Sequence, residues 1–282
     1  MGAGVVAFAE NREEKTLTVE SIKYAEHKNG VKWAYFPALT QIGLRHGIST
    51  RFGGVSCADL ASLNLGVKVG DAPENIATNR RCFAEALGVS DERIVASGQV
   101  HETNVAIVTD EHAGQRIAAT DGLVTNTPNL PLLLFFADCV PLLIYDPVQK
   151  VIGLSHAGWK GTLHSIGPKT IATMQQAFAT DPADCVVGIA PSIGPDDYEV
   201  DQPVLDEISK IWQRPEQFCR PTRQGHWLLD LWRWNQLQFI NSGVKTENIH
   251  IAGISTAKNP DLFFSHRASH GAAGRFGVLM TL

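Results

Sequence analysis

Hydrophobic stretches long enough to cross a membrane are absent from this sequence. The longest uninterrupted apolar run, Leu130 to Phe136, has the length of a strand and falls well short of the roughly 18 residues that a membrane span needs. The opening segment, MGAGVVAFAENREEK, has no basic part, and its apolar run is too short for a signal peptide. It begins with Met-Gly, but Val6 stands where a myristoylation signal has Ser or Thr. We therefore expect a cytoplasmic protein without a membrane partner.

Positive charge and cysteine are scarce as well. The formal net charge is -5 for 282 residues, whereas binding to nucleic acid or to an anionic membrane surface needs a basic excess. The 5 cysteines are odd in number and widely scattered, which is a poor disulfide framework. They form no CxxC pair, so a structural zinc knuckle is not indicated. This usage fits a reducing compartment, and a local pocket for a small anion is still compatible with the charge.

Nucleotide-binding and serine-hydrolase signatures are missing too. No GxGxxG or GxxxxGK[ST] motif follows an expected strand, and there is no GxSxG nucleophile elbow. The sequence also lacks internal repeats, low-complexity tracts and Pro/Ser-rich linkers. These features predict one α/β domain over residues 36–282, preceded by a loosely attached extension over residues 1–35.

Expected helices and strands follow one another along the chain. A helix is predicted within residues 71–90, with Asp71 as its cap, Pro73 in its first turn and Gly88 just past its end. A tight turn at Asp146-Pro147 predicts a hairpin. Because hairpins stand beside strand–helix units, we expect a mixed sheet rather than a purely parallel one. The expected strands cover residues 104–110, 121–126, 130–136, 140–146, 150–156, 185–191 and 248–256, and the other helices cover 204–212, 230–243 and the part of 161–180 after a loop with Gly167-Pro168.

Three metal-capable residues stand at the ends of expected strands: His101 in SGQVHETNV, Cys139 in FFADCVP and His156 in LSHAGWKG. Two imidazoles and one thiolate suit zinc, and three protein ligands leave a fourth position for water or substrate. The residues lie far apart in the sequence, so the fold must bring them together. The alternative is three separate structural residues, with Cys139 as a small hydrophobe that fills a gap in the core.

An aspartate directly precedes the candidate cysteine ligand. Asp138 stands among apolar residues, where a carboxylate is rarely buried without a partner. It could orient an imidazole of the metal site, or it could act as an acid or base. As an alternative, it caps the turn between two strands.

Glycine-containing turns provide candidate contacts for an anion. HAGWKGT places Lys160 between glycines at the entry to a helix, and STRFGGVS places Arg51 beside Gly53-Gly54. The loop APSIGPDDYEV offers Ser192 and Tyr198 to a pocket. Ordinary tight turns are the alternative for these segments. Most of the remaining histidines, a group that includes His46, lack such a setting and are interpreted as surface residues.

Several of these segments together resemble a known family. From about residue 40 to the C-terminus, in order, the sequence is similar to the YfiH/YlmD-like family in GISTRFGGVS, SLNLGVKVGD, QVHETNV, DGLVTNTPNLPLLLFFADCVPLLIYDP, HAGWKGT, PSIGPDDYEV and the closing NPDLFFSHR and GRFGVLMTL. That family carries the label of a polyphenol oxidase with a laccase domain and, more recently, that of a purine nucleoside phosphorylase. The resemblance implies a single α/β domain with layered mixed sheets flanked by helices.

The resemblance also implies a site and an activity. It places one zinc ion on His101, Cys139 and His156, with copper as the other possible metal. It implies phosphorolysis of adenosine, inosine, guanosine and methylthioadenosine to the base and ribose-1-phosphate, with adenosine deamination as a side activity. Purine nucleosides and phosphate are then the partners, and we expect Arg51, Lys160, Asn64 and Ser192 to contact them.

The sequence departs from the family pattern at several positions. Lys160 replaces the usual arginine, which keeps the charge but loses bidentate geometry. Asp196-Asp197 replaces a cysteine pair, and Ser255 and Lys258 replace two further cysteines, so none of these can supply a thiolate. RASHGAAG stands where RRDGG is usual, which puts a substrate contact by Arg267 in doubt.

A mechanism and its rivals follow from these residues. Phosphate attacks the anomeric carbon of the ribose, with Arg51, Lys160 and the glycine turns as anion contacts. In deamination, water activated at the metal attacks C6 of the purine, and Asp138 transfers the proton. One rival is a Cys-His hydrolase or amidase with Cys139 as the nucleophile, and another is a binding protein without turnover. A copper-dependent polyphenol oxidase is disfavoured, because the sequence supplies a single three-ligand set.

Overall fold

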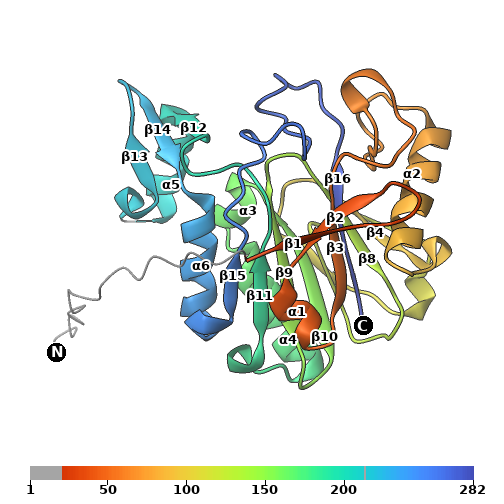
Figure 1. Ribbon diagram of the computed structural model, residues 1–282. Coiled ribbons are helices and arrows are strands. Elements are labelled where there is room, and N and C mark those ends of the chain that lie inside the picture. Colours follow the sequence, from red (N-terminus) through yellow and green to blue (C-terminus); the bar gives the residue numbers. More distant parts are fainter. Residues whose placement is uncertain (1–20, 213) are drawn as a thin grey trace.

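The computed structural model describes residues 21–212 and 214–282, which form three sheets and six α-helices within that range (Figure 1). The first sheet has the strand order β1 (Lys23–Glu26), β2 (Lys32–Tyr35), β3 (Arg45–Ser49), β16 (Phe276–Thr281), β8 (Leu132–Phe136), β4 (Val95–Gly98) and β6 (Arg116–Ala118). The second has the order β15 (Ile249–Ile251), β11 (Val186–Ile189), β9 (Val140–Asp146), β10 (Val151–Ala157), β7 (Gly122–Thr125) and β5 (Val105–Ile107). The third is β12 (Glu199–Asp201), β14 (His226–Leu229) and β13 (Cys219–Pro221). The helices are α1 (Pro37–Gln41), α2 (Pro73–Ala86), α3 (Trp159–Leu163), α4 (Ile166–Phe178), α5 (Gln202–Ile211) and α6 (Leu231–Asn241).

The two large sheets pack face to face, and each has helices on its outer face. In β8, Leu132 and Leu134 point into the core between the sheets, whereas Leu133 packs in a separate cluster with Phe83 of α2. The strands β9 and β10 likewise divide their side chains between the inter-sheet core and a third cluster, which contains residues of α4 and α6. Strands buried on both faces read as continuous apolar runs, which explains LPLLLFF and VPLLIYD. The expected layered, mixed α/β domain is confirmed.

The predicted hairpin is present as the β9–β10 pair. Its register places Val151 opposite Asp146, and the Oδ1 atom of Asp146 accepts hydrogen bonds from the backbone N–H groups of Val148 and Gln149. The aspartate therefore closes the turn with its side chain, as the Asp-Pro sequence suggests.

Two details of the expected helices are wrong. Helix α2 begins at Pro73 with Ala72 as its cap residue, and the Asp71 side chain instead accepts hydrogen bonds from Ser56 and Asn64, in addition to its helical neighbours. Helix α4 begins at Ile166, so Gly167 and Pro168 lie in its first turn and not in a loop. Proline is well tolerated in a first helical turn, because its missing N–H would have no partner there.

The extension expected over residues 1–35 is also corrected. Within the described residues, β1 and β2 pair with each other, and β2 pairs with β3, so the large sheet begins at Lys23. Charged residues in both strands obscured the pattern, since the exposed edge of a sheet tolerates them. The part of the predicted extension before residue 21 lies outside the described residues.

None of the helices in the described part of the chain combines the length and the apolar character that a membrane span requires.

Candidate metal centre

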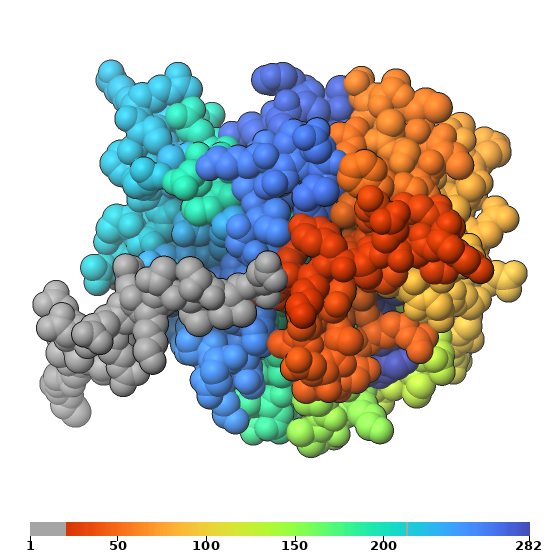
Figure 2. Space-filling view, viewed as in Figure 1, coloured from red at the N-terminus to blue at the C-terminus, as the bar shows by residue number. Residues whose placement is uncertain are grey.

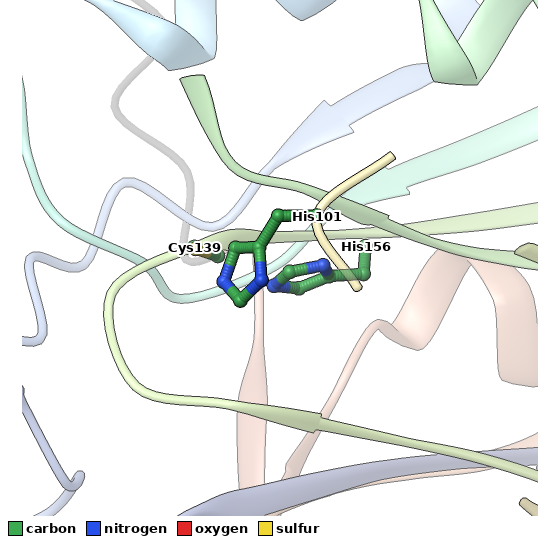
Figure 3. A group of neighbouring side chains, drawn as sticks. All are labelled: His101, Cys139 and His156. Carbon is green, nitrogen blue, oxygen red and sulfur yellow. The ribbon is translucent and has the colours of Figure 1, made fainter. Parts of the chain in front are cut away.

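The three predicted ligands meet at one point of the fold. The donor atoms of His101, Cys139 and His156 all lie within 4.8 Å of one another, and the two imidazole rings are arranged edge to face (Figure 3). Cys139 lies where the chain leaves β8 of one large sheet and enters β9 of the other. The prediction that the fold brings these residues together is confirmed.

Strand direction explains why they converge. Strands β4 and β8 are parallel, so the segment after β4, which carries His101, lies at the same sheet edge as the segment after β8, which carries Cys139. Strand β10 runs antiparallel to β9, and its register places His156 opposite Pro141 at the start of β9. All three donors therefore lie at one end of the paired sheets.

Asp121 hydrogen-bonds to both histidines, and it was not among the site residues predicted from the sequence. Its Oδ1 atom accepts a hydrogen bond from Nδ1 of His156 at 2.8 Å, which leaves Nε2 of that ring as the ligand atom. The carboxylate also accepts from the backbone N–H groups of Val100, His101 and Glu102 at 3.0, 3.1 and 3.1 Å. One buried carboxylate thus fixes one imidazole directly and the backbone of the other, as in carboxylate–histidine–metal arrangements.

The charges in this cluster favour a bound cation. Burial alone would raise the pKa of Cys139, but the neighbouring His156 and His101 lower it to about 6. Burial alone would lower the pKa of His156, but the Cys139 thiolate and Asp121 raise it to about 9. A thiolate and a buried carboxylate therefore flank the imidazoles, and a metal ion between the donors would replace the proton that this negative charge attracts.

Glycine at position 158 keeps space open beside the sulfur. A Cβ atom there would come within 3.1 Å of the Cys139 Sγ atom and 3.7 Å of the His101 ring. The glycines of HAGWKGT thus do allow close backbone approach, and at Gly158 the group approached is the ligand set itself.

Asp138 ties the site to its surrounding loops. Its carboxylate accepts hydrogen bonds from the Thr256 hydroxyl and the Arg267 backbone N–H, both at 2.6 Å, and its carbonyl accepts from the Ile193 N–H. Its backbone is left-handed, with a φ of 85°. The imidazole-orienting role considered for Asp138 belongs instead to Asp121, whereas Asp138 lines both cavities beside the ligands.

Two cavities meet at the ligand set. The larger has a volume of about 470 Å³ and the smaller about 270 Å³. Both are lined by His101, Asp138, Cys139, Ile193 and Tyr198. Figure 2 shows the segment before β16, in blue, lying between the small sheet, in cyan, and the segment before α2, in orange. Residues of the segments before β16 and before α2 line the larger cavity, together with Tyr198, which directly precedes the small sheet.

Only one of the four predicted substrate contacts, Lys160, lines either of these two cavities. Lys160 lines the smaller cavity, with its ammonium group 5.6 Å from the centre of the Trp159 ring. Arg51 donates to the carbonyls of Ala61 and Pro260 and lies against the Phe264 ring.

Asn64 and Ser192 are both completely buried. Asn64 bonds to Asp71 and to the Arg275 backbone N–H, and Ser192 accepts from the Trp232 indole. Together with Arg51, these residues therefore support the walls around the site and do not line either cavity.

The larger cavity instead contains basic residues that the sequence analysis did not select or left in doubt. They are Lys68, Arg116, Arg267 and Arg275, and they come from three separate parts of the chain: the segment before α2, strand β6 and the segment before β16. His266 lines the same cavity and is exposed. Isolated basic residues carry no sequence signal of a shared site, and only the fold brings them together.

The positions that depart from the family's cysteines form a cluster of their own. The Ser255 hydroxyl donates to Asp197 at 2.6 Å, and the Lys258 ammonium lies 3.5 Å from the same carboxylate. At these positions a carboxylate, a hydroxyl and an ammonium group thus replace the thiols, and the hydroxyl and the ammonium group both interact with the carboxylate.

Comparison with known proteins identifies the family. Residues 45–282 match the family described as "Multi-copper polyphenol oxidoreductase laccase". The chain belongs to this family. It is 36% identical over 236 residues to "Purine nucleoside phosphorylase YlmD" of Bacillus subtilis, a match that covers 81% of this chain and 85% of the relative. It is 37% identical over 238 residues to the protein of the same name from Geobacillus stearothermophilus, with 81% and 86% covered.

Solved structures share the fold. The crystal structure of the Bacillus licheniformis hypothetical protein YfiH superposes with a TM-score of 0.86 at 31% identity, covering 92% of this chain and 98% of that one. The crystal structure of YlmD from Geobacillus stearothermophilus gives a TM-score of 0.85 at 33% identity, with the same coverage of both chains. The resemblance that the sequence motifs indicated is therefore confirmed.

The ligand set fits one metal ion and does not fit a multicopper centre. His101, Cys139 and His156 form the single cluster of at least three His, Cys, Asp or Glu donors found in residues 21–212 and 214–282. Blue-copper and trinuclear copper centres need several groups of histidines. Two imidazoles with one thiolate and room for a fourth ligand are typical of a catalytic zinc site.

Proposed function

We propose that this protein is a metal-dependent purine nucleoside phosphorylase. The observation that carries the proposal is the junction of two cavities at His101 and Cys139, two of the three clustered ligands, in a chain that is 36% and 37% identical to relatives named purine nucleoside phosphorylase. The reaction has two separable reactants, a nucleoside and phosphate, and a two-part cavity that meets at one reactive centre suits that requirement. Zinc is the metal that the donor set favours, with copper as the alternative.

The protein residues have distinct roles in this proposal. Asp121 holds the two imidazoles in place and keeps Nε2 of His156 free to bind the metal. Bound at this centre, a zinc ion would supply Lewis acidity toward an oxygen or nitrogen atom of the substrate. Tyr198, which lines both cavities, packs beneath the guanidinium group of Arg267 and can contact the ribose or the base.

The proposed substrates are adenosine, inosine, guanosine and methylthioadenosine, which share a purine on a β-linked ribose. Adenosine deamination is proposed as a side activity, in which water adds to C6 of the purine and ammonia leaves. Asp138 is the carboxylate that lines both cavities, so we assign it the proton transfer between the water and the leaving amine.

A phosphate-dependent assay tests the proposal. Purified protein is incubated with each nucleoside, with and without inorganic phosphate, and the products are separated by chromatography. The expected result is free base together with ribose-1-phosphate, formed only when phosphate is present. Base release that is independent of phosphate, or no base release from any purine nucleoside, would contradict the proposal.

A Cys-His hydrolase is the second candidate, because the lowered pKa of Cys139 and two adjacent imidazoles also suit a nucleophilic thiol. The two functions respond differently to reagents. A chelator should abolish the activity of the metal enzyme, and readdition of zinc should restore it. A hydrolase would retain activity with the chelator and lose it to a thiol-alkylating reagent.

A further inference from the structure

Positive charge accumulates in the larger cavity without matching negative charge. Its basic residues, Lys68, Arg116, Arg267 and Arg275, form no ion pair with a carboxylate anywhere in the described part of the chain. Asp138 is the one acidic residue among the described residues of the cavity lining, and its two oxygens already accept from Thr256 and the Arg267 backbone. Concentrated, unpaired positive charge in a concave site attracts an anion.

Two of these residues are free to bind a ligand. Lys68 and Arg116 are exposed, and the side chain of neither makes a hydrogen bond or an ion pair within the described residues. The others are held in position: Arg275 donates to the carbonyls of Ala273 and Gly274, and Arg267 donates to the carbonyl of Glu199. The lining of the larger cavity thus combines two arginines fixed by hydrogen bonds, Arg267 and Arg275, with two basic side chains that have no other partner within the described residues.

A second layer of charge lies behind the wall. Arg80 donates twice to the Leu65 carbonyl, and its guanidinium lies 4.6 Å from the centre of the Phe135 ring, which itself lines the cavity. Burial and then the positive charge of Arg116 lower the pKa of Arg80 to about 10. An anion between these side chains would relieve that repulsion.

The smaller cavity has a different character. Its lining includes the apolar or aromatic residues Trp159, Ile193, Tyr198 and Leu231, and Lys160 is its one basic side chain apart from the histidine ligand, among the described residues. Flat aromatic surfaces with few charges suit a planar, neutral ring system.

We propose that the larger cavity binds the phosphate dianion through Lys68, Arg116 and Arg275, and that the smaller cavity holds the purine base. This inference rests on the proposed function and divides its site into two. The ribose then lies at the junction, beside His101, Cys139 and Tyr198, which line both cavities.

The chemistry of the reaction requires such a division. A bond forms between a phosphate oxygen and the anomeric carbon while the bond from that carbon to N9 of the purine breaks. The electron pair of the broken bond leaves with the base, and the proton of hydrogen phosphate ends on the base, so charge and atoms balance. In a direct displacement the nucleophile and the leaving group lie on opposite faces of the anomeric carbon. The phosphate and the purine base therefore need separate cavities on opposite sides of the sugar.

Substitutions in the larger cavity test the inference. The variants Arg116→Gln and Lys68→Gln each remove a charged donor from an exposed position, so both should fold normally. We expect the KM for inorganic phosphate to rise about tenfold or more in each variant, with the KM for inosine unchanged, since a hydrogen bond to a charged group contributes at least that factor. Arg45→Gln, an exposed arginine of β3 that lines neither cavity, is the control for the change in net charge.

A binding measurement separates this inference from the proposed function. Titration of inorganic phosphate into the metal-loaded protein, followed by calorimetry, should show binding that is weakened in both variants and retained in Arg45→Gln. Unchanged phosphate binding in Arg116→Gln and Lys68→Gln, or its loss in Lys160→Gln alone, would overturn the inference. If the wild-type protein forms no ribose-1-phosphate, the proposed function fails, while phosphate binding that depends on Arg116 still supports the anion site.

Kinetics with a nucleotide distinguish free phosphate from a phosphate group attached to the nucleoside. Inosine 5′-monophosphate should inhibit in competition with inorganic phosphate and should not replace inosine as the substrate. Cleavage of the nucleotide in preference to inosine would show that the larger cavity recognises a phosphate attached to the substrate, which would overturn the assignment to free phosphate.

Discussion

His46 and His156 are both almost completely buried, yet their surroundings shift their pKa values in opposite directions. His46 accepts from the Phe36 N–H through Nε2 and faces the Leu44 carbonyl through Nδ1, and burial lowers its pKa to about 4. His156 is surrounded by the Cys139 thiolate and Asp121, which raise its pKa to about 9 against the effect of burial. Backbone partners make a buried imidazole a neutral core residue, whereas anionic partners make it part of a cation site.

Among the substitutions that distinguish the surroundings of His156 from those of His46, Cys139→Ser should have the largest effect on activity. Removing the thiolate takes away one of the three metal ligands. Phosphate-dependent turnover should therefore fall by more than roughly 100-fold, which is the largest loss typical of residues that only hydrogen-bond to a metal ligand. Cys185→Ser, at a buried cysteine that lines neither cavity, is the control and should retain activity. Equal activity of the two variants in the nucleoside assay would remove Cys139 from the site.

A smaller effect is expected from Asp121→Asn. The amide can no longer stabilise the His156 imidazole by charge, and it can present a donor where four N–H groups now converge. Metal affinity, measured by competition with a chromogenic chelator, should weaken about 10–100-fold.

Asp146→Asn is the control for that change, since Asp146 is also a buried aspartate but only closes the β9–β10 turn. Its metal affinity should equal that of the wild type. If both variants weaken metal binding alike, the effect of Asp121 comes from general destabilisation and not from the hydrogen bond to His156.

His46 should influence stability and leave the metal site unchanged. Its folded pKa of about 4 is below its ordinary value of 6.5, so the unfolded chain binds more protons between these pH values. The stability contributed by neutral His46 is therefore fully present above pH 6.5 and is lost as the pH falls toward 4, by roughly 3 kcal/mol in total. Denaturant unfolding of wild type and His46→Gln across this range should show a steeper loss in the wild type. Parallel loss in both proteins would contradict the assigned environment.

The sequence was informative where one physical constraint acts alone. Continuous apolar runs predicted the doubly buried strands β8 and β9, and Asp230 correctly predicted the start of α6, where its side chain accepts from the Arg233 N–H. The metal ligands could be selected because His101, Cys139 and His156 are metal-capable residues in otherwise strand-like surroundings.

Residues whose role depends on distant partners could not be assigned in this way. Asp121 precedes a glycine at a strand entry and looks like a turn residue, because nothing local shows that His156 will lie 2.8 Å away. His46 was interpreted as a surface residue because the pairing of β3 with both β2 and β16, which buries it, is not visible in the sequence. Arg116 lies on an edge strand and gains a role only through the cavity that other segments complete.

The most direct test of the account is the metal coordination of the purified protein. Elemental analysis together with X-ray absorption at the metal edge should find about one zinc ion per chain, with one sulfur ligand at about 2.3 Å and nitrogen ligands at about 2.0–2.1 Å. The sulfur contribution should disappear in Cys139→Ser. A protein that contains no stoichiometric metal, or a metal without a sulfur ligand, would contradict the central claim that His101, Cys139 and His156 form a single metal centre.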